Sequence, residues 1–425
     1  MIRILNYNDI ENKEIVASPR PTDDVSGVVA EIIARVKSEG DKALYEYAER
    51  FDKVKLASLR VSEEEIAEGV ASVEESFLKI LEKSAQNIRE YHEKQRRDGF
   101  EIRREKGVVL GQKVTPIERV GLYVPGGTAA YPSTVLMDAI PAKIAGCEKV
   151  VMVTPPGKDG KLPAVILAAA KVAGVDEIYK VGGAQAIAAL AYGTESIPKV
   201  FKIVGPGNAF VAEAKKQVFG QVSIDMIAGP SEILVLADGE NDPECIAADL
   251  LSQAEHDRNA SAVLITDDPV FAKGVQGAIE GLLAGMERRD IARASIDNNG
   301  KIIVVDSLEQ GIDVANDIAP EHLELAVADP FGYLDRVRHA GSVFLGRNCP
   351  EPIGDYYAGM NHTLPTCGTA RFSSALSVDD FVKKIQYAYY TEEALADAAP
   401  SVAAFARKEG LTGHAKSATI RSEKK

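Results

Sequence analysis

Basic side chains are scarce in this sequence relative to acidic ones. The 425 residues include 49 Lys and Arg against 63 Asp and Glu, which gives a formal net charge of −14 at pH 7. Nucleic-acid binding depends on basic side chains that neutralise phosphates, so a field of this sign repels a polyanion. We therefore expect no nucleic-acid partner, although a small local basic pocket stays possible.

Long apolar runs are lacking as well. The longest uncharged stretch, residues 120–137, contains two prolines and three glycines and therefore cannot form a membrane helix. Residues 1–9 become polar too early for the apolar core of a secretion signal, which needs roughly 7–15 residues. We expect a cytoplasmic protein without a membrane partner.

Cysteine is rare, and the four cysteines include no CxxC pair. In a reducing compartment they stay thiols, and we expect small core or loop residues at Cys147, Cys245, Cys349 and Cys367. Hydrophobic residues make up 46% and charged residues 26%, which is typical of a globular protein. The length suggests two to four domains of roughly 100–200 residues each.

Apolar spacing predicts helices from about residue 24 to 97, with His92 on a solvated helix face, and again beyond residue 377, with an interruption at Pro400. Between these regions, β-branched runs alternate with alanine-rich helical stretches. The predicted strands are residues 150–153, 178–181, 200–204, 233–236, 262–266, 302–305 and 342–345. Such alternation indicates parallel α/β sheets.

We therefore predict an α/β fold with two Rossmann-like parallel-sheet domains, a helical N-terminal region and a small helical C-terminal module. The expected divisions are an N-terminal segment 1–20, a discontinuous first α/β domain 21–118 and 231–374, a second α/β domain 119–230, and a C-terminal domain 375–425.

Glycine turns stand where predicted strands end or helices begin, at residues 124–127, 181–185, 204–208 and 228–231. At the carboxyl ends of parallel strands, glycines let a ligand approach the backbone, and helix N-termini favour phosphate. A nucleotide cofactor is therefore one hypothesis; tight βα loops without a ligand are the alternative. The GxGxxG fingerprint is absent, because Phe210 occupies the third glycine position.

Polar residues in the second half suggest a metal site. Gln253 and His256 are three residues apart on a predicted helix, Asp355 lies in a predicted loop, and His414 follows Gly413. Imidazole, carboxylate and amide oxygen together could bind a divalent metal such as zinc. Hydrogen-bonding roles for each residue remain an equal alternative.

Two further histidines have neighbours that suggest chemistry. Glu321 and His322 form an acid–imidazole pair that could transfer protons, although such pairs are also common on solvated surfaces. His362 lies in a predicted loop rich in Gly, Pro and Thr, where functional groups are often presented.

Taken in order, these segments resemble the histidinol dehydrogenase family. The matching stretches are residues 121–127, 182–188, 205–208, 228–232, 253–257, 319–323, 359–366 and 409–414, so the resemblance covers nearly the whole chain. It implies the NAD-dependent oxidation of L-histidinol through the aldehyde to L-histidine, with one zinc per subunit. One departure is Gly413, where the family often has alanine.

The resemblance also implies roles for individual residues. The metal ligands would be Gln253, His256, Asp355 and His414, and the acid–base pair would be Glu321 and His322. NAD would contact Tyr123, Gln185 and Asn208. The substrate would contact the metal ligands and His322, and in addition Ser231, His362 and Glu409. The family forms homodimers in which the C-terminal module completes the active site of the partner.

Three other interpretations remain open at this point. A related zinc- and NAD-dependent dehydrogenase could oxidise another polar alcohol. A zinc hydrolase could use Glu321 to activate water, with purely structural glycine turns. A non-catalytic binding protein could retain the fold, although it would be expected to lose metal or acid–base residues.

Overall fold

The structure is a computed structural model that describes residues 1–9, 24–126 and 130–423. Most of the expected N-terminal segment 1–20, and Gly127 of the first glycine turn, lie outside the described residues. Internal contacts divide the chain into two units. The first comprises Met1–Gln95 and Ile117–Phe381, and the second Arg96–Pro116 and Val382–Lys425.

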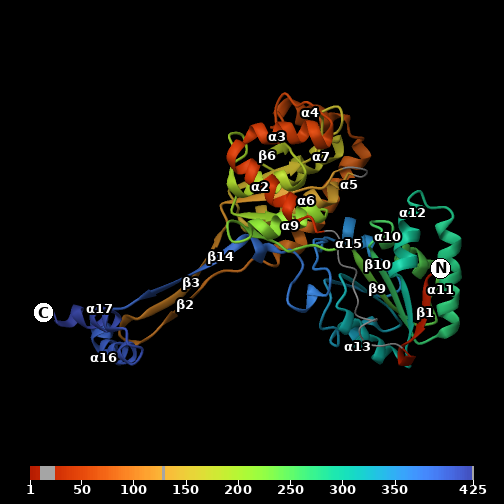
Figure 1. The fold of residues 1–425 in the computed structure, drawn as a ribbon. Coiled ribbons are helices and arrows are strands. Elements are labelled where there is room, and N and C mark those ends of the chain that lie inside the picture. Colours follow the sequence, from red (N-terminus) through yellow and green to blue (C-terminus); the bar gives the residue numbers. More distant parts are fainter. Residues whose placement is uncertain (10–23, 127–129, 424–425) are drawn as a thin grey trace. The chain divides into compact units, whose positions relative to one another are not determined.

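One half of the first unit is a six-stranded parallel sheet (Figure 1). Its strands, in spatial order, are β1 (Arg3–Asn6), β11 (Lys301–Val304), β10 (Ser261–Thr266), β9 (Glu232–Ala237), β12 (His322–Ala326) and β13 (Ser342–Leu345). Its helices are α10 (Pro243–Ala254), α11 (Pro269–Leu283), α12 (Arg289–Asn299), α13 (Leu308–Ile318), α14 (Pro330–Leu334) and α15 (Pro352–Tyr356).

Alternating side chains of β9 explain how this sheet is covered. Ile233 and Val235 pack in the apolar core with α10, α11 and α12, whereas Leu234 and Leu236 pack in the core with α13. Because both faces are buried, the strands are continuous apolar runs, as parallel sheets require.

The other half of the first unit is a five-stranded parallel sheet. Its strands, in spatial order, are β6 (Glu177–Lys180), β5 (Lys149–Thr154), β4 (Arg119–Tyr123), β7 (Lys202–Val204) and β8 (Ser223–Ile224). Its helices are α6 (Pro132–Ala145), α7 (Ala164–Ala173), α8 (Gly183–Tyr192) and α9 (Ala209–Val218). Within both sheets, strands that we predicted from sequence are confirmed.

The N-terminal helices pack with this second sheet. They are α2 (Ser26–Glu39), α3 (Asp41–Tyr47), the π-helix η2 (Ala48–Asp52), α4 (Glu63–Ser72) and α5 (Glu75–Glu93). Helix α2 contacts α8 and α9, α4 contacts α7, and α5 contacts α6. The expected domain division placed residues 21–118 together with residues 231–374. The contacts of the N-terminal helices instead join them to the five-stranded half, because their apolar stripes pack on that half.

The second unit is a three-stranded antiparallel sheet followed by two helices. The strands are β2 (Phe100–Arg103), β3 (Val109–Pro116) and β14 (Val382–Tyr389), and the helices are α16 (Glu392–Lys408) and α17 (Thr412–Glu423). Residues 382–389, expected to be helical, form a strand because they pair along their whole length with β3. Helix α16 runs through Pro400 instead of ending there. Short 3₁₀ helices complete the described chain: η1 (Tyr7–Asp9), η3 (Glu105–Gly107), η4 (Thr369–Arg371) and η5 (Val378–Phe381).

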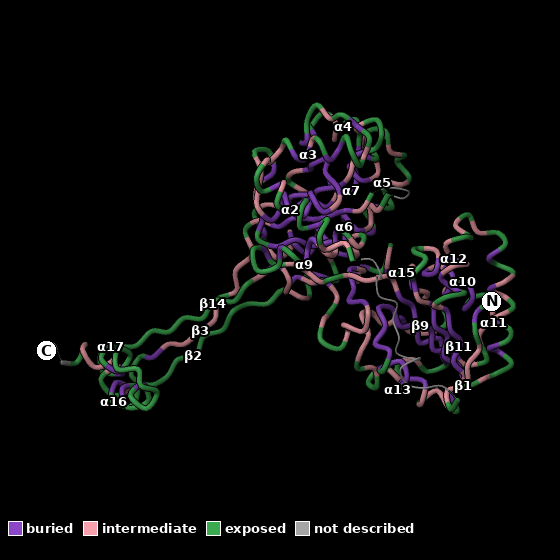
Figure 2. Tube along the Cα trace, in the orientation of Figure 1, coloured by how far each residue is buried: buried purple, intermediate pink, exposed green. Residues whose placement is uncertain are grey.

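Burial follows the two parallel sheets (Figure 2). His92, expected on a solvated helix face, is completely buried, because it continues the stripe of Leu81, Ala85 and Ile88 on α5. All four cysteines are free, but Cys245 is an exposed residue of α10 and so lies in neither core nor loop. Among the described residues, no helix combines the length and the apolar character needed to cross a bilayer.

Candidate active site

Several candidate residues lie where the strands of the six-stranded sheet begin. Ser231 precedes β9, Glu321 precedes β12, and His322 is the first residue of β12. Helix α10 follows β9 and runs back across the sheet, so its last turn, with Gln253, returns to the same edge. The sequence thus brings distant residues together at the amino ends of parallel strands.

His322 is buried at this edge with a defined tautomer. Its Nδ1 lies 2.9 Å from the carbonyl oxygen of Glu232 and 3.1 Å from the side-chain amide of Gln253. The carbonyl oxygen accepts from Nδ1–H, which leaves the Nε2 lone pair free; this tautomer requires the Gln253 amide to turn its oxygen toward Nδ1, because its nitrogen at 3.1 Å can only donate. Burial lowers the pKa of His322 to about 4, so the ring is neutral near pH 7.

Glu321 lies beside this imidazole. Its Oε2 accepts a hydrogen bond of 2.8 Å from the backbone N–H of Glu232 and lies 3.8 Å from His322 Nδ1. Burial raises the pKa of Glu321 well above its ordinary value. Both members of the pair are buried, which excludes the solvated-surface alternative. A carboxyl group with a raised pKa next to a neutral imidazole is suited to acid–base work.

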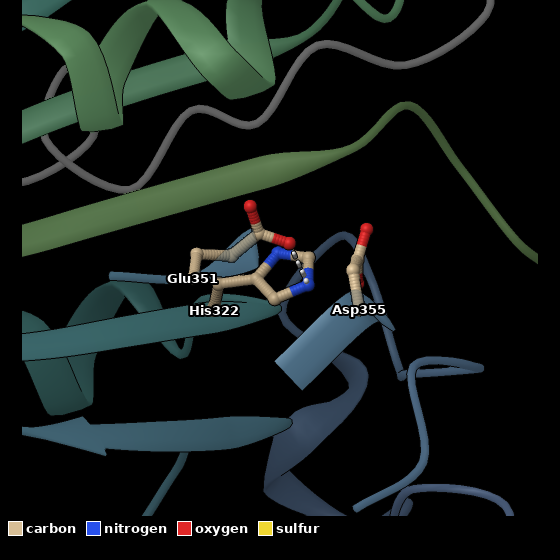
Figure 3. Close-up of side chains that lie close together, drawn as sticks. All are labelled: His322, Glu351 and Asp355. Carbon is tan, nitrogen blue, oxygen red and sulfur yellow. Dashed lines mark ion pairs between the residues drawn. The ribbon is translucent and has the colours of Figure 1, made fainter. Parts of the chain in front are cut away.

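Three side chains converge in Figure 3: His322, Glu351 and Asp355. Glu351 Oε1 lies 3.6 Å from His322 Nε2. Burial, followed by the charge of Asp355, raises the pKa of Glu351 to about 10. Burial is the largest single effect on Asp355 and acts to raise its pKa, but the contacts with His362, His322 and Glu351 together lower it. The carboxylate of Asp355 is therefore the ionised member of this cluster.

His362 is the partner of Asp355. Its Nδ1 lies 3.5 Å from Asp355 Oδ1, and its Nε2 lies 3.3 Å from Thr134 Oγ1. Burial is the largest single effect and acts to lower the pKa of His362, but the hydrogen bonds and charge of Asp355, together with the charge of Asp138, raise it overall. This loop histidine thus meets the same carboxylate as the cluster in Figure 3.

The cluster in Figure 3 fits a divalent metal. One donor atom from each of its three residues lies within 4.8 Å of the other two. His322 Nε2 and Glu351 Oε1 are buried without a hydrogen-bond partner among the described residues. Imidazole nitrogen and carboxylate oxygen are ligands that zinc accepts, so these unpaired atoms are consistent with a cation at this edge.

Sequence reasoning missed Glu351, and it placed Asp355 in a loop. The two residues are four apart, and Asp355 lies in the short helix α15, which begins directly after Glu351. That spacing puts both carboxyls on one face of a helical turn and could have indicated the pair. His256, just beyond α10, is an exposed residue whose ring nevertheless interacts with the charge of Asp355; desolvation is the larger effect and lowers its pKa.

The candidate NAD contacts lie at the opposite kind of edge, where the strands of the five-stranded sheet end. Tyr123 ends β4, Gln185 lies in the first turn of α8, and Asn208 caps α9 by accepting from two backbone N–H groups. The Tyr123 hydroxyl accepts a hydrogen bond of 3.1 Å from Gly183 N. Parallel pairing places the ends of these strands at one edge.

Gly205 shows how tightly one of these turns is built. Its φ is +115°, and a Cβ atom here would meet the carbonyl oxygen of Tyr123 and lie 3.1 Å from Asp138 Oδ2. Only glycine fits this conformation and this approach. The turn at 204–208 is therefore held by backbone geometry as well as by the Asn208 cap.

The remaining candidates belong to the second unit. Glu409 is an exposed residue at the end of α16, and His414 is an exposed residue in the first turn of α17. His414 lines a cavity of about 540 Å³ within this unit, together with Leu395, Val402, Gly413, Ser417, Ala418 and Arg421.

Comparisons with known proteins agree on one family. The family model for histidinol dehydrogenase matches residues 17–422. The chain is 57% identical over 403 residues to a histidinol dehydrogenase of Geobacillus kaustophilus, covering 95% of each protein. It is 52% identical over 426 residues to that of Clostridium acetobutylicum, covering 99% of each.

A solved structure is equally similar in fold. The crystal structure of histidinol dehydrogenase from Elizabethkingia anophelis superposes with a TM-score of 0.95 at 39% identity, covering 100% of this chain and 98% of the other. Both sequence and fold therefore identify the chain as a member of the histidinol dehydrogenase family, the oxidoreductases of histidine biosynthesis.

Proposed function

We propose that this protein oxidises L-histidinol to L-histidine in two successive steps, with two NAD as hydride acceptors and one zinc per subunit. The observation that carries the proposal is the buried edge where His322, with a free Nε2, lies beside Glu321 and within 4.8 Å of carboxylates. We place the reaction in the cytoplasm.

The proposed zinc ligands are Gln253, His256, Asp355 and His414. Asp355 is supported by its lowered pKa and by its place in the cluster, and Gln253 by its contact with His322. Bound zinc would supply a Lewis acid that holds and polarises the amino alcohol. Glu351 is a further carboxyl group at this position, 3.6 Å from His322 Nε2, and it lies outside the proposed ligand set.

His322 is the proposed base of the first oxidation. Its neutral Nε2 takes the hydroxyl proton of the substrate, while the Glu232 carbonyl group fixes the ring through Nδ1–H. Burial keeps the ring unprotonated at neutral pH and therefore ready to accept that proton.

Glu321 is the proposed base of the second oxidation. As the carboxylate, it takes a proton from water while the water oxygen adds to the aldehyde carbon, and the carbonyl oxygen takes the proton that His322 gained in the first oxidation, which gives the diol. Burial favours the protonated form of Glu321, whereas the hydrogen bond that its side chain accepts from the Glu232 backbone N–H stabilises the charged carboxylate. NAD, when bound, accepts one hydride in each oxidation.

The other proposed contacts divide between the two sheets and the second unit. NAD is assigned to Tyr123, Gln185 and Asn208, because glycine turns and helix N-termini at that edge suit a dinucleotide phosphate. Besides the zinc ligands and His322, the substrate is assigned to Ser231, His362 and Glu409. We further propose a homodimer in which Glu409 and His414 of each chain complete the site of the other.

The deciding measurement is the amount of NADH formed per L-histidinol consumed by the purified, zinc-loaded protein. A ratio of two supports the full reaction. A ratio of one would limit the activity to the first oxidation. Absence of NADH would overturn the proposal and make other alcohols, and then a zinc hydrolase, the next candidates.

A further inference from the structure

The loop residues on either side of His362 are buried and bonded. Asn361 donates to the carbonyl oxygen of Met137 at 2.6 Å, and its side-chain oxygen accepts from Thr363 N at 2.9 Å. The Thr363 hydroxyl donates to Asp138 Oδ1 at 2.9 Å. Both neighbours of the proposed substrate contact are therefore fixed by polar groups inside the protein.

One face of α6 supplies most of these partners. Thr134, Met137 and Asp138 are spaced by three and four residues, which places them on the same side of the helix. They meet His362, Asn361 and Thr363 respectively. The five-stranded half of the first unit thus holds a loop that carries part of the site in the six-stranded half.

The second support is His92 at the end of α5. Its Nδ1 lies 2.7 Å from Gln95 Oε1, which also accepts from Val378 N, so Nδ1 is the donor. Its Nε2 then serves as the acceptor facing the Asn361 side-chain amide at 3.5 Å. Both ring nitrogens are occupied inside the protein, so this buried histidine is not available for proton transfer in the reaction.

We propose that His92 and Asp138 are positioning residues that hold the segment Asn361–Thr363 and so set the imidazole of His362 toward Asp355 and the substrate. The inference rests on the proposed function, because it assumes that His362 contacts L-histidinol. Neither residue touches the substrate; each acts through a neighbour of His362.

The Thr363 hydroxyl offers the sharper test. Thr363→Val keeps the shape but deletes the bond to Asp138, whereas Thr363→Ser keeps the hydroxyl. We expect Thr363→Val to bind L-histidinol roughly tenfold more weakly, and Thr363→Ser to restore nearly wild-type affinity. The measurement is calorimetric titration of the zinc-loaded protein with L-histidinol in the absence of NAD.

His92→Phe tests the other support, because it retains a ring but removes both bonds. We expect the KM for L-histidinol to rise roughly tenfold, with unchanged zinc content and a KM for NAD within about twofold of wild type. His339→Phe, the same change at a histidine of the six-stranded half, is the matched control and should leave both KM values unchanged.

The outcomes separate this inference from the proposed function. If wild-type protein binds no L-histidinol, the proposed function fails and the inference falls with it. If wild type binds but Thr363→Val binds equally well, the inference alone is overturned. Equal weakening in Thr363→Val and Thr363→Ser would also overturn it, because Thr363→Ser keeps the hydroxyl and loss of the hydrogen bond could not then explain the effect. If His92→Phe does not fold, the Thr363 pair decides the role of Asp138, and Gln95→Leu, which removes the acceptor of His92 Nδ1–H, decides the role of His92 by the same KM measurement.

Discussion

The two α/β halves of the first unit place their candidate residues at opposite edges of their sheets. In the five-stranded half, glycine turns and the first turns of helices follow the ends of strands. In the six-stranded half, Glu321 and the imidazole of His322 lie at the start of β12, beside the last turn of α10 and the carboxyls of Glu351 and Asp355. Helix N-termini favour anions and helix C-termini favour cations. Two parallel sheets can thus provide two kinds of site: the edge where strands end suits a dinucleotide phosphate, and the edge where strands begin suits a metal ion.

The largest effect is expected at the edge that carries the chemistry. His322→Asn removes the proposed base but leaves the glycine turns intact. Turnover should fall by about 10²–10⁴-fold, while the KM for NAD stays near its wild-type value. Steady-state kinetics with both substrates, together with elemental analysis for zinc, checks this. Nearly normal turnover would place the base elsewhere, and loss of zinc would make His322 a metal ligand.

The next largest effect is expected for zinc binding at the same edge, where variants of His256 and Glu351 test which residues are ligands. His256→Ala should lose zinc, because imidazole is among the strongest ligands that zinc finds in proteins. Glu351→Gln, the matched change at a residue outside the proposed ligand set, should retain it. Elemental analysis of both variants after dialysis is the measurement. Full zinc in His256→Ala and loss in Glu351→Gln would exchange the two roles.

A weaker effect is expected at the glycine edge. Gly205→Ala must strain a backbone with φ of +115° and push against the Tyr123 carbonyl group, which costs on the order of 1–3 kcal/mol. We expect the KM for NAD to rise roughly tenfold and the L-histidinol affinity to fall by a smaller factor, because the added Cβ atom also lies against Asp138. Gly277→Ala on α11, where a Cβ atom has nothing within 4 Å, is the control and should be neutral or slightly stabilising. An unchanged KM for NAD would remove this turn from the cofactor site.

The proposed dimer predicts that His414 of the second unit completes the active site of the other chain. His322→Asn and His414→Ala should each be inactive alone. Co-refolding the two should restore about a quarter of wild-type activity, because half of randomly formed dimers are mixed and each has one intact site. Activity assays on the co-refolded mixture measure this. If mixing restores no activity, then His414 serves the site of its own chain or no site.

Local patterns predicted much of this architecture. The apolar runs of the two sheets and the glycine turns are continuous in sequence, and the structure has strands and turns there. Glu351 and Thr134 escaped notice because their partners lie far along the chain, at His322 and His362. The strand β14 was mistaken for a helix because its stability depends on pairing with β3, more than 250 residues earlier.

The smallest effect concerns His92, a histidine of the five-stranded half that performs no chemistry. Burial lowers its pKa, so the folded protein protonates it at a lower pH than the unfolded chain, whose His92 has the ordinary pKa of about 6.5. Below that pH the unfolded state binds more protons, and the free energy of unfolding falls as pH falls. The contribution of this one site has a slope of at most about 1.4 kcal/mol per pH unit. In urea unfolding at pH 7.5 and 5.5, His92→Gln should therefore lose less stability on acidification than wild type does. An equal loss in both proteins would mean that His92 takes up no extra proton on unfolding, and that the acid sensitivity lies with the imidazoles of the six-stranded half.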